Sequence, residues 1–398
     1  MKISSNFFVE LKQAQRFKQG QIVCGDNILI RRLKSQNRIL GVLSDGLGSG
    51  VKANVLSSLT ASMAMKYATN DSDLALAART IMDTLPVDDE RQISYSTFTI
   101  LDIDFWGNCS VVEYDNPRFV LMRNGKEQQV ECEISEGYLD KAERKYELYI
   151  SKFKLEMNDR IVFYSDGVSQ SGIGSERYPF GWEREQIVQF LEYLLGKFPR
   201  ITAAAISDQI VEHAYANSQY RAVDDISCVA LNIRKPHQLL VVTGPSVKME
   251  NDVVMAQRIG QHQGKTAVCG GTTASIIARE LQAEIEMNLE AIDPEVPCYS
   301  KMAGVNLITE GMLTLAKAIE ILQEDCPESE MQKDNGAVKL LKLFFECDII
   351  EFLVGTRINE VHQDPNMPLE LGIRRNTIKN LARLLEEKKL KEIKVEYI

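Results

Sequence analysis

Acidic residues at four separate places in the first 235 residues could supply oxygen ligands to metal ions. Asp45 and Asp166 each follow an apolar run inside the tripeptide Ser-Asp-Gly, Asp26 lies between two apolar stretches, and Asp224 and Asp225 precede a further apolar run. Short apolar runs of this kind are typical of β-strands. If the four strands are neighbours, their carboxylates converge at one end of the strands.

Carboxylates gathered in this way need positive charge among them, because each raises the free-energy cost of ionising the others. Divalent cations are the simplest source of that charge. The ligands would all be oxygens, since neither Cys nor His accompanies the four places, and this favours magnesium or manganese over zinc. Asp45 on its own could instead be an acidic residue near the positive end of the following helix. The repeated pattern favours the metal interpretation.

The elements that would position these residues form a block of antiparallel strands between pairs of helices. The strands are joined by short turns, such as the hairpin signal Asn124-Gly125, and must therefore run antiparallel. Helical spacing of apolar residues begins after the glycine-rich segment, at Val51, Val55, Leu56, Leu59 and Met63. Two early and two late helices fit two packed sheets with helices on each outer face; the predicted helices span residues 51–70, 72–85, 183–198 and 201–217.

In its motifs and their order, this region resembles the bacterial SpoIIE/RsbU-type serine/threonine phosphatases of the metal-dependent PPM (type 2C) superfamily. The resemblance covers about residues 1–234 and implies an α+β fold, the α-β-β-α sandwich. Leu47, the turn at residues 115–117 and Ile226-Ser227 depart from the usual motifs, but no carboxylate is lost. The motifs are Gly25-Asp26, Ser44 to Gly50, Asn116-Pro117, Asp159 to Gly167 and Asp224 to Ser227.

The resemblance also implies the roles of the site residues. Asp45 would bridge two Mn²⁺ or Mg²⁺ ions, the Gly46 carbonyl and Asp26 would complete one coordination sphere, and Asp166 and Asp224 the other. Asp225 is a weaker candidate, because the family's ligand is the first residue of the pair. Water activated between the ions would attack phosphorus, so Asp45 and Asp166 would act in catalysis through the metals and no side-chain nucleophile is needed.

By the same resemblance, the substrate is a phosphoserine or phosphothreonine on a partner protein, such as an anti-sigma factor antagonist. A hypothesis from a different class is a signalling or ligand-sensing module in which the phosphatase-like half is a catalytically silent scaffold. The presence of all the expected carboxylates favours the enzyme.

Length, composition and charge indicate the general class of protein and the partners that are not expected. The chain has 398 residues, 44% hydrophobic and 26% charged, which is typical of soluble globular proteins of more than one domain. The net charge is −10 and basic residues form no block, so neither nucleic acid nor a membrane surface is an expected partner. A signal peptide and a transmembrane segment are not predicted, and a cytoplasmic location is expected. The eight cysteines form no Cys-x-x-Cys pair and are interpreted as reduced.

The remaining residues, 238–398, are predicted to form a separate and smaller domain, because Pro236 interrupts the chain after the last strand of the first region. Strand and helix patterns alternate here, which indicates a parallel-rich α/β fold. Gly270, Gly271, Thr272 and Thr273 lie between a strand and a helix, where backbone amides could bind a small anionic ligand. A plain turn with a threonine cap is the alternative. Such a domain could regulate the first or bind a ligand.

Overall fold

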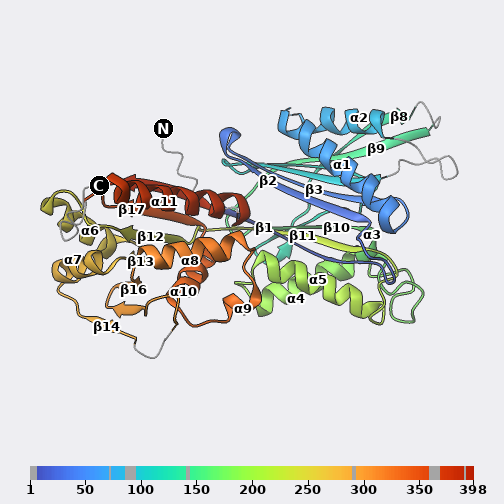
Figure 1. Cartoon of the computed structure of the whole chain (residues 1–398). Coiled ribbons are helices and arrows are strands. Elements are labelled where there is room, and N and C mark those ends of the chain that lie inside the picture. The colour runs from blue at the N-terminus through green and yellow to red at the C-terminus, as the bar shows by residue number, and fades with distance from the viewer. Residues whose placement is uncertain are drawn as a thin grey trace. The chain divides into compact units, whose positions relative to one another are not determined.

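A computed structural model describes residues 7–70, 73–85, 96–139, 144–288, 293–357, 368–389 and 391–398. The chain divides into two compact units, Met1–Lys235 and Pro236–Ile398 (Figure 1). Among the described residues, no helix combines the length and the apolar character needed to cross a membrane.

One of the two sheets of the first unit has six strands, in the order β2-β3-β4-β5-β9-β8. Every neighbouring pair in this sheet is antiparallel. Because β2 and β3 are adjacent, the start of β2 lies beside the end of β3. The strands are β2 (Asp26–Leu33), β3 (Arg38–Gly46), β4 (Ser96–Asp104), β5 (Asn108–Tyr114), β8 (Cys132–Leu139) and β9 (Arg144–Lys154).

The other sheet has five strands, in the order β1-β11-β10-β6-β7, and is also antiparallel. The predicted hairpin at Asn124-Gly125 is confirmed: it joins β6 to β7, and both residues have positive φ, 53° and 76°. The strands are β1 (Phe8–Arg16), β6 (Val120–Arg123), β7 (Lys126–Glu127), β10 (Arg160–Tyr164) and β11 (Ile226–Arg234).

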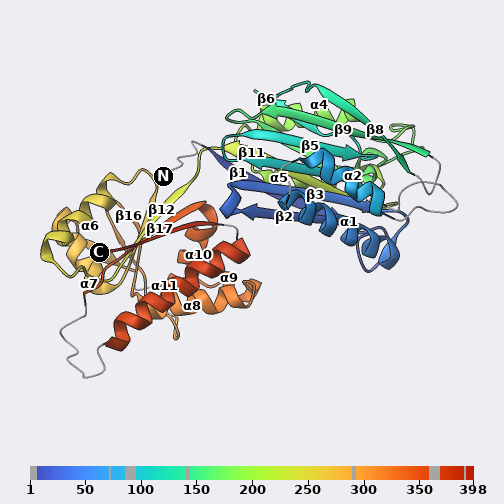
Figure 2. The same cartoon turned by 90° about the horizontal axis from the view of Figure 1, so that it is seen from above.

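Helices cover the outer face of each sheet, and the two inner faces pack against each other (Figures 1 and 2). One buried apolar cluster lies between α1, α2 and the six-stranded sheet, a second lies between the sheets, and a third lies under α4 and α5. The predicted α-β-β-α sandwich is confirmed. The helices of this unit are α1 (Gly50–Asn70), α2 (Leu74–Thr84), α3 (Asp166–Ser169), α4 (Arg184–Lys197) and α5 (Ala203–Asn217).

Helix α1 forms where the apolar spacing predicts it, but those apolar residues do not form its buried face. Val51, Val55 and Leu59 are 62%, 58% and 49% exposed. Apart from Met65, the buried face instead consists of small side chains, which let α1 lie close to β2 and β3. Its members are Gly50, Ala53, Ser57, Thr60, Ala61, Ala64, Met65 and Ala68.

Two further boundaries differ from the sequence prediction. The strand expected to end in Ser165-Asp166-Gly167 ends at Tyr164, and Asp166 is the first residue of the short helix α3. Of the helix predicted over residues 72–85, residue 72 lies outside the described residues. Within them, α2 begins at Leu74 and is capped by the Asp73 carboxylate, which accepts a hydrogen bond from the Ala75 amide.

The second unit contains a seven-stranded sheet in the order β14-β15-β16-β13-β12-β17-β18. Five neighbouring strands of this sheet, β16, β13, β12, β17 and β18, run parallel to one another. The strands β14 and β15 form an antiparallel edge beside β16. The strands are β12 (Gln238–Thr243), β13 (Lys265–Cys269), β14 (Ile285–Met287), β15 (Ser300–Met302), β16 (Val305–Thr309), β17 (Ile349–Val354) and β18 (Glu392–Tyr397).

Helices pack on both faces of this sheet, α6 and α7 against one apolar cluster and α8, α10 and α11 against another (Figure 2). The predicted parallel-rich α/β fold is confirmed, although the short edge strands β14 and β15 and the last strand β18 were not predicted. The helices are α6 (Met249–Gln261), α7 (Gly271–Leu281), α8 (Met312–Gln323), α9 (Glu328–Met331), α10 (Gly336–Glu346) and α11 (Pro368–Lys389).

We predict that Phe163→Ala destabilises the first unit by about 3–5 kcal/mol, because Phe163 is fully buried in the cluster between the two sheets and its loss leaves a cavity. Denaturant unfolding of the full chain, followed by circular dichroism, measures the change. Phe180→Ala is the matched control: Phe180 is 75% exposed, and its removal should change stability by less than about 0.5 kcal/mol. Equal effects of the two substitutions would contradict the packing described.

Candidate active site

Asp26 and Asp45 are direct partners across the β2–β3 ladder. Asp26 is 3% exposed, and neither of its carboxylate oxygens has a hydrogen-bond partner among the described residues. Burial raises the pKa of Asp26 to about 7; the charge of Asp225 adds to the rise, and the nearby hydroxyls of Ser227 and Ser165 oppose it. A buried acceptor group without a donor indicates a place for a cation.

Asp166 and Asp224 come together through the five-stranded sheet. Because β10 and β11 are antiparallel, Asp166, just beyond the end of β10, lies beside Asp224, just before β11. The backbone approach is close here: a Cβ atom on Gly167 would lie 2.1 Å from the Asp225 carbonyl oxygen. Burial raises the pKa of Asp166, and the charge of Asp224 raises it further. Only glycine fits at position 167, which explains the second Ser-Asp-Gly motif.

The acids of the two sheets interact with each other at the rim of the sandwich. Burial raises the pKa of Asp45 well above its ordinary value, and the charges of Asp26 and Asp166 raise it further. Asp45, Asp166 and Asp224 all line one open cavity of about 880 Å³, together with Gly46. The structure therefore brings the four predicted acidic places to one site.

Asp224 and Asp225 have different surroundings. The Asp224 side chain is 41% exposed, lines the cavity and lies 3.7 Å from the Lys18 Nζ atom. Asp225 is 3% exposed, and its Oδ1 atom accepts a hydrogen bond of 2.9 Å from the Lys18 amide. A Cβ atom added to Gly25 would lie 2.7 Å from the Oδ2 atom of Asp225. Asp224 is thus open to a ligand, and Asp225 is engaged in holding the β1–β2 turn.

Gly46 is the residue at which β3 and α1 come closest. A Cβ atom added there would lie 2.1 Å from the carbonyl oxygen of Ala53, so no side chain fits. This close packing keeps the end of β3 against the first turn of α1. Gly46 lines the same cavity as Asp45.

The donor set fits hard divalent cations. It consists of carboxylates and a backbone carbonyl, the ligands that magnesium and manganese prefer. Within the described residues, no group of three or more His, Cys, Asp or Glu side chains is positioned so that it could hold a metal ion by itself. The partnerless oxygens of buried Asp26 and the mutual repulsion at Asp45 are nevertheless what a cation would relieve.

Sequence reasoning treated residues 115–117 only as a turn and missed the arginine that follows it. Arg118 lines the cavity, and its Nε atom lies 2.6 Å from the Oε2 atom of buried Glu113. The guanidinium also stacks over the Tyr149 ring, 4.6 Å from its centroid. Burial raises the pKa of Glu113 to about 7, against the opposing charge of Arg118. Lys18 was missed as well, because its neighbour Asp224 is distant in sequence.

A further missed residue is Gln170, which lines the cavity one helical turn after Asp166. Its Nε2 atom donates a hydrogen bond of 2.9 Å to Asp166 Oδ2. The i,i+4 spacing could have indicated this contact if the short helix had been predicted.

The residues predicted to bind an anion in the second unit lie at the β13–α7 junction. Gly270 caps α7 with φ 132°, Gly271 begins the helix, Thr272 is exposed and Thr273 is 1% exposed. The Gly270 amide donates to the Thr309 carbonyl and is therefore already engaged. The anionic ligand stays a prediction.

The rim of carboxylates between two antiparallel sheets, with helices outside, defines the architecture expected of a metal-dependent phosphatase. The family model for stage II sporulation protein E (SpoIIE) matches residues 35–234. The chain belongs to the SpoIIE family.

The chain also shows similarity to individual relatives and to solved structures. The chain is 25% identical over 179 residues, 44% of its own length and 82% of the relative, to the phosphoserine phosphatase RsbX of Bacillus subtilis (strain 168). Among solved structures, the SpoIIE phosphatase domain from Bacillus subtilis is 19% identical, with coverages of 58% of this chain and 94% of that domain and a TM-score of 0.42. RsbX in complex with magnesium is 21% identical, with coverages of 56% and 95% and a TM-score of 0.38. Both TM-scores are below 0.5, so the assignment to the family depends on the family model alone.

We predict that Gly46→Ala destabilises the first unit by about 1–3 kcal/mol, because the new methyl group forces β3 and α1 apart. It should also weaken Mn²⁺ binding, measured by isothermal titration calorimetry, since Asp45 moves with the strand end. Gly196→Ala in α4 is the control: no atom lies within 4 Å of an added Cβ, and stability should stay equal or rise by up to about 1 kcal/mol. Unchanged stability and Mn²⁺ affinity in Gly46→Ala would count against this close contact.

Proposed function

We propose that the first unit is a protein serine/threonine phosphatase that hydrolyses a phosphoserine or phosphothreonine on a partner protein and depends on two Mn²⁺ or Mg²⁺ ions. The observation that carries the proposal is that Asp45, Asp166 and Asp224 line one cavity and that Asp26 lies opposite Asp45 in the β2–β3 ladder. Burial raises the pKa of Asp26, Asp45 and Asp166, and neighbouring carboxylates raise each of these pKa values further. Membership of the SpoIIE family supports it.

The residues that would hold the ions are those predicted from the sequence. Asp45 would serve both ions, because its carboxylate interacts with Asp26 of its own sheet and with Asp166 of the other. Asp26 and the Gly46 carbonyl would complete one site, and Asp166 and Asp224 the other. Asp225 is the weaker candidate, since its Oδ1 atom already accepts the Lys18 amide.

When bound, two divalent cations supply Lewis acidity: they neutralise charge on the phosphoryl group and make water a stronger nucleophile at neutral pH. The protein orients the groups around them. Gln170 donates a hydrogen bond to one oxygen of Asp166 and so orients this carboxylate at the cavity. Arg118, fixed by Glu113 and Tyr149, adds positive potential on the cavity wall, where a phosphate ester has to enter.

A relative supports the proposed class of substrate. RsbX is a phosphoserine phosphatase, and we infer that a phosphorylated regulatory protein, such as an anti-sigma factor antagonist, is the substrate of this chain. The open cavity of about 880 Å³ supports a protein substrate, because a phosphorylated side chain can reach the carboxylates from the surface.

We predict that Asp45→Asn lowers Mn²⁺-dependent release of phosphate from a phosphoserine peptide by more than about 100-fold, because both ions lose a shared ligand. Without metal, the melting temperature of this variant should equal or exceed that of the wild type, since one repelling charge is gone. Both measurements use the full chain. Full turnover by Asp45→Asn would refute the assignment. A folded wild type that binds Mn²⁺ but hydrolyses neither the peptide nor p-nitrophenyl phosphate would instead support the silent scaffold.

We further predict that Asp224→Asn weakens Mn²⁺ binding at least about tenfold more than Asp225→Asn does. Asp224 faces the cavity, whereas the side-chain oxygen that remains after the substitution at position 225 could still accept the Lys18 amide. Isothermal titration calorimetry on the two variants compares them directly, and each serves as the control for the other. The reverse order of affinities would overturn the choice within the pair.

A further inference from the structure

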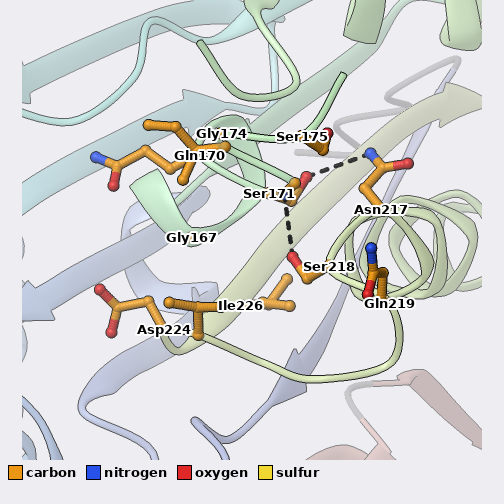
Figure 3. Close-up of a pocket in the computed structure, with 13 residues that line it drawn as sticks. Gly167, Gln170, Ser171, Gly174, Ser175, Asn217, Ser218, Gln219, Asp224 and Ile226 are labelled. Carbon is orange, nitrogen blue, oxygen red and sulfur yellow. Dashed lines mark hydrogen bonds between the residues drawn. The ribbon is translucent and has the colours of Figure 1, made fainter. Parts of the chain in front are cut away.

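A second pocket, of about 310 Å³, opens beside the catalytic cavity (Figure 3). It lies between the segment after α3, residues 167–175, and the segment that joins α5 to β11, residues 217–226. Figure 3 shows Gln170 and Asp224 on one side of the pocket and Asn217 and Gln219 on the other.

The pocket and the catalytic cavity share part of their walls. Gln170 and Asp224 line both of them. A chemical group in the pocket would therefore be separated from a phosphate ester in the cavity by no more than these shared wall residues.

The far wall of the pocket is held by hydrogen bonds between the two segments. Ser171 is 3% exposed, and its hydroxyl accepts a hydrogen bond of 3.3 Å from Asn217 Nδ2. The Ser218 hydroxyl accepts one of 3.1 Å from the Gly172 amide. Gly172 has φ 73°, and a Cβ atom there would lie 3.0 Å from the Asn217 carbonyl oxygen. The wall is thus formed by fixed contacts and not by chance proximity of two loops.

The chemistry of the pocket is neutral. Apart from Asp224 on the catalytic side, its lining consists of glycine, serine, asparagine, glutamine and aliphatic residues. Ile173 and Val223 are 57% and 69% exposed and offer apolar contact. A carboxylate in the pocket would face Asp224 with no cationic lining residue to pair with, and its charge would be partly desolvated. An uncharged side chain fits better.

We propose that this pocket is a specificity subsite for an uncharged residue immediately before or after the phosphorylated residue of the substrate protein. The proposal rests on the proposed phosphatase function and deepens it: the substrate class becomes a phosphoprotein whose modified residue has an uncharged neighbour.

The test uses the full chain with Mn²⁺ and three phosphoserine peptides that differ only in one flanking residue, valine, glutamate or lysine, placed first before and then after the phosphoserine. At one of the two positions, the wild type should prefer valine to glutamate about tenfold in kcat/KM. Ile173→Lys should raise the glutamate-to-valine ratio at that position about five- to tenfold, and Ile173→Glu should lower it and raise the lysine-to-valine ratio. Each value is a ratio within one variant, so a loss of turnover common to all peptides cancels.

Leu76→Lys is the matched control, because Leu76 is 50% exposed on α2 and is not part of either cavity. Its peptide ratios and its hydrolysis of p-nitrophenyl phosphate should equal those of the wild type. Equal turnover of all peptides by the wild type, or ratios that do not respond to the charge at position 173, would overturn the subsite and leave the phosphatase intact. No turnover of p-nitrophenyl phosphate by the wild type would overturn the proposed function itself, and the subsite with it.

Discussion

The main constraint on the first unit is that hydrogen-bonded strands hold carboxylates close to one another. The β2–β3 ladder places Asp26 opposite Asp45, and the ends of β10 and β11 place Asp166 beside Asp224. The side chains cannot separate without breaking ladder hydrogen bonds, so the fold maintains their repulsion. Such repulsion has a free-energy cost, and on the proposed function a bound cation would lower that cost and so stabilise the folded state.

The same rim requires unusually close backbone approach. Side chains are excluded at Gly46 by the Ala53 carbonyl and at Gly167 by the Asp225 carbonyl. Close packing extends along α1, whose buried face consists mostly of small residues. Larger residues there would push the helix away from β3. The glycines of the Ser-Asp-Gly motifs are therefore explained by close packing of the backbone, and the acidic residues beside them by the proposed binding of metal ions.

Much of this site could be predicted from the sequence, because each acid lies at a strand boundary that its local pattern reveals. Asp26, Asp45, Asp166 and the pair Asp224-Asp225 needed only the strand pattern and the assumption that the strands are neighbours, whereas the choice of Asp224 within the pair came from the family resemblance. Lys18 and Arg118 could not be found in this way, because their partners are set by tertiary packing. For a related reason, the sequence did not show that Val51, Val55 and Leu59 on α1 are exposed. Helical spacing predicts a helix, but the sheet against which the helix packs decides which of its faces is buried.

The five-stranded sheet joins the beginning of this unit to its end, since β1 pairs along its whole length with β11, Phe8 opposite Arg234. The β1–β2 turn is likewise tied to the segment before β11 through the Gln19 amide and the Ala222 carbonyl. During synthesis, β1 emerges first and must wait for its partner strand, so these long-range contacts form late and slowly. A nascent chain cannot assemble the rim of carboxylates until almost the entire unit has left the ribosome.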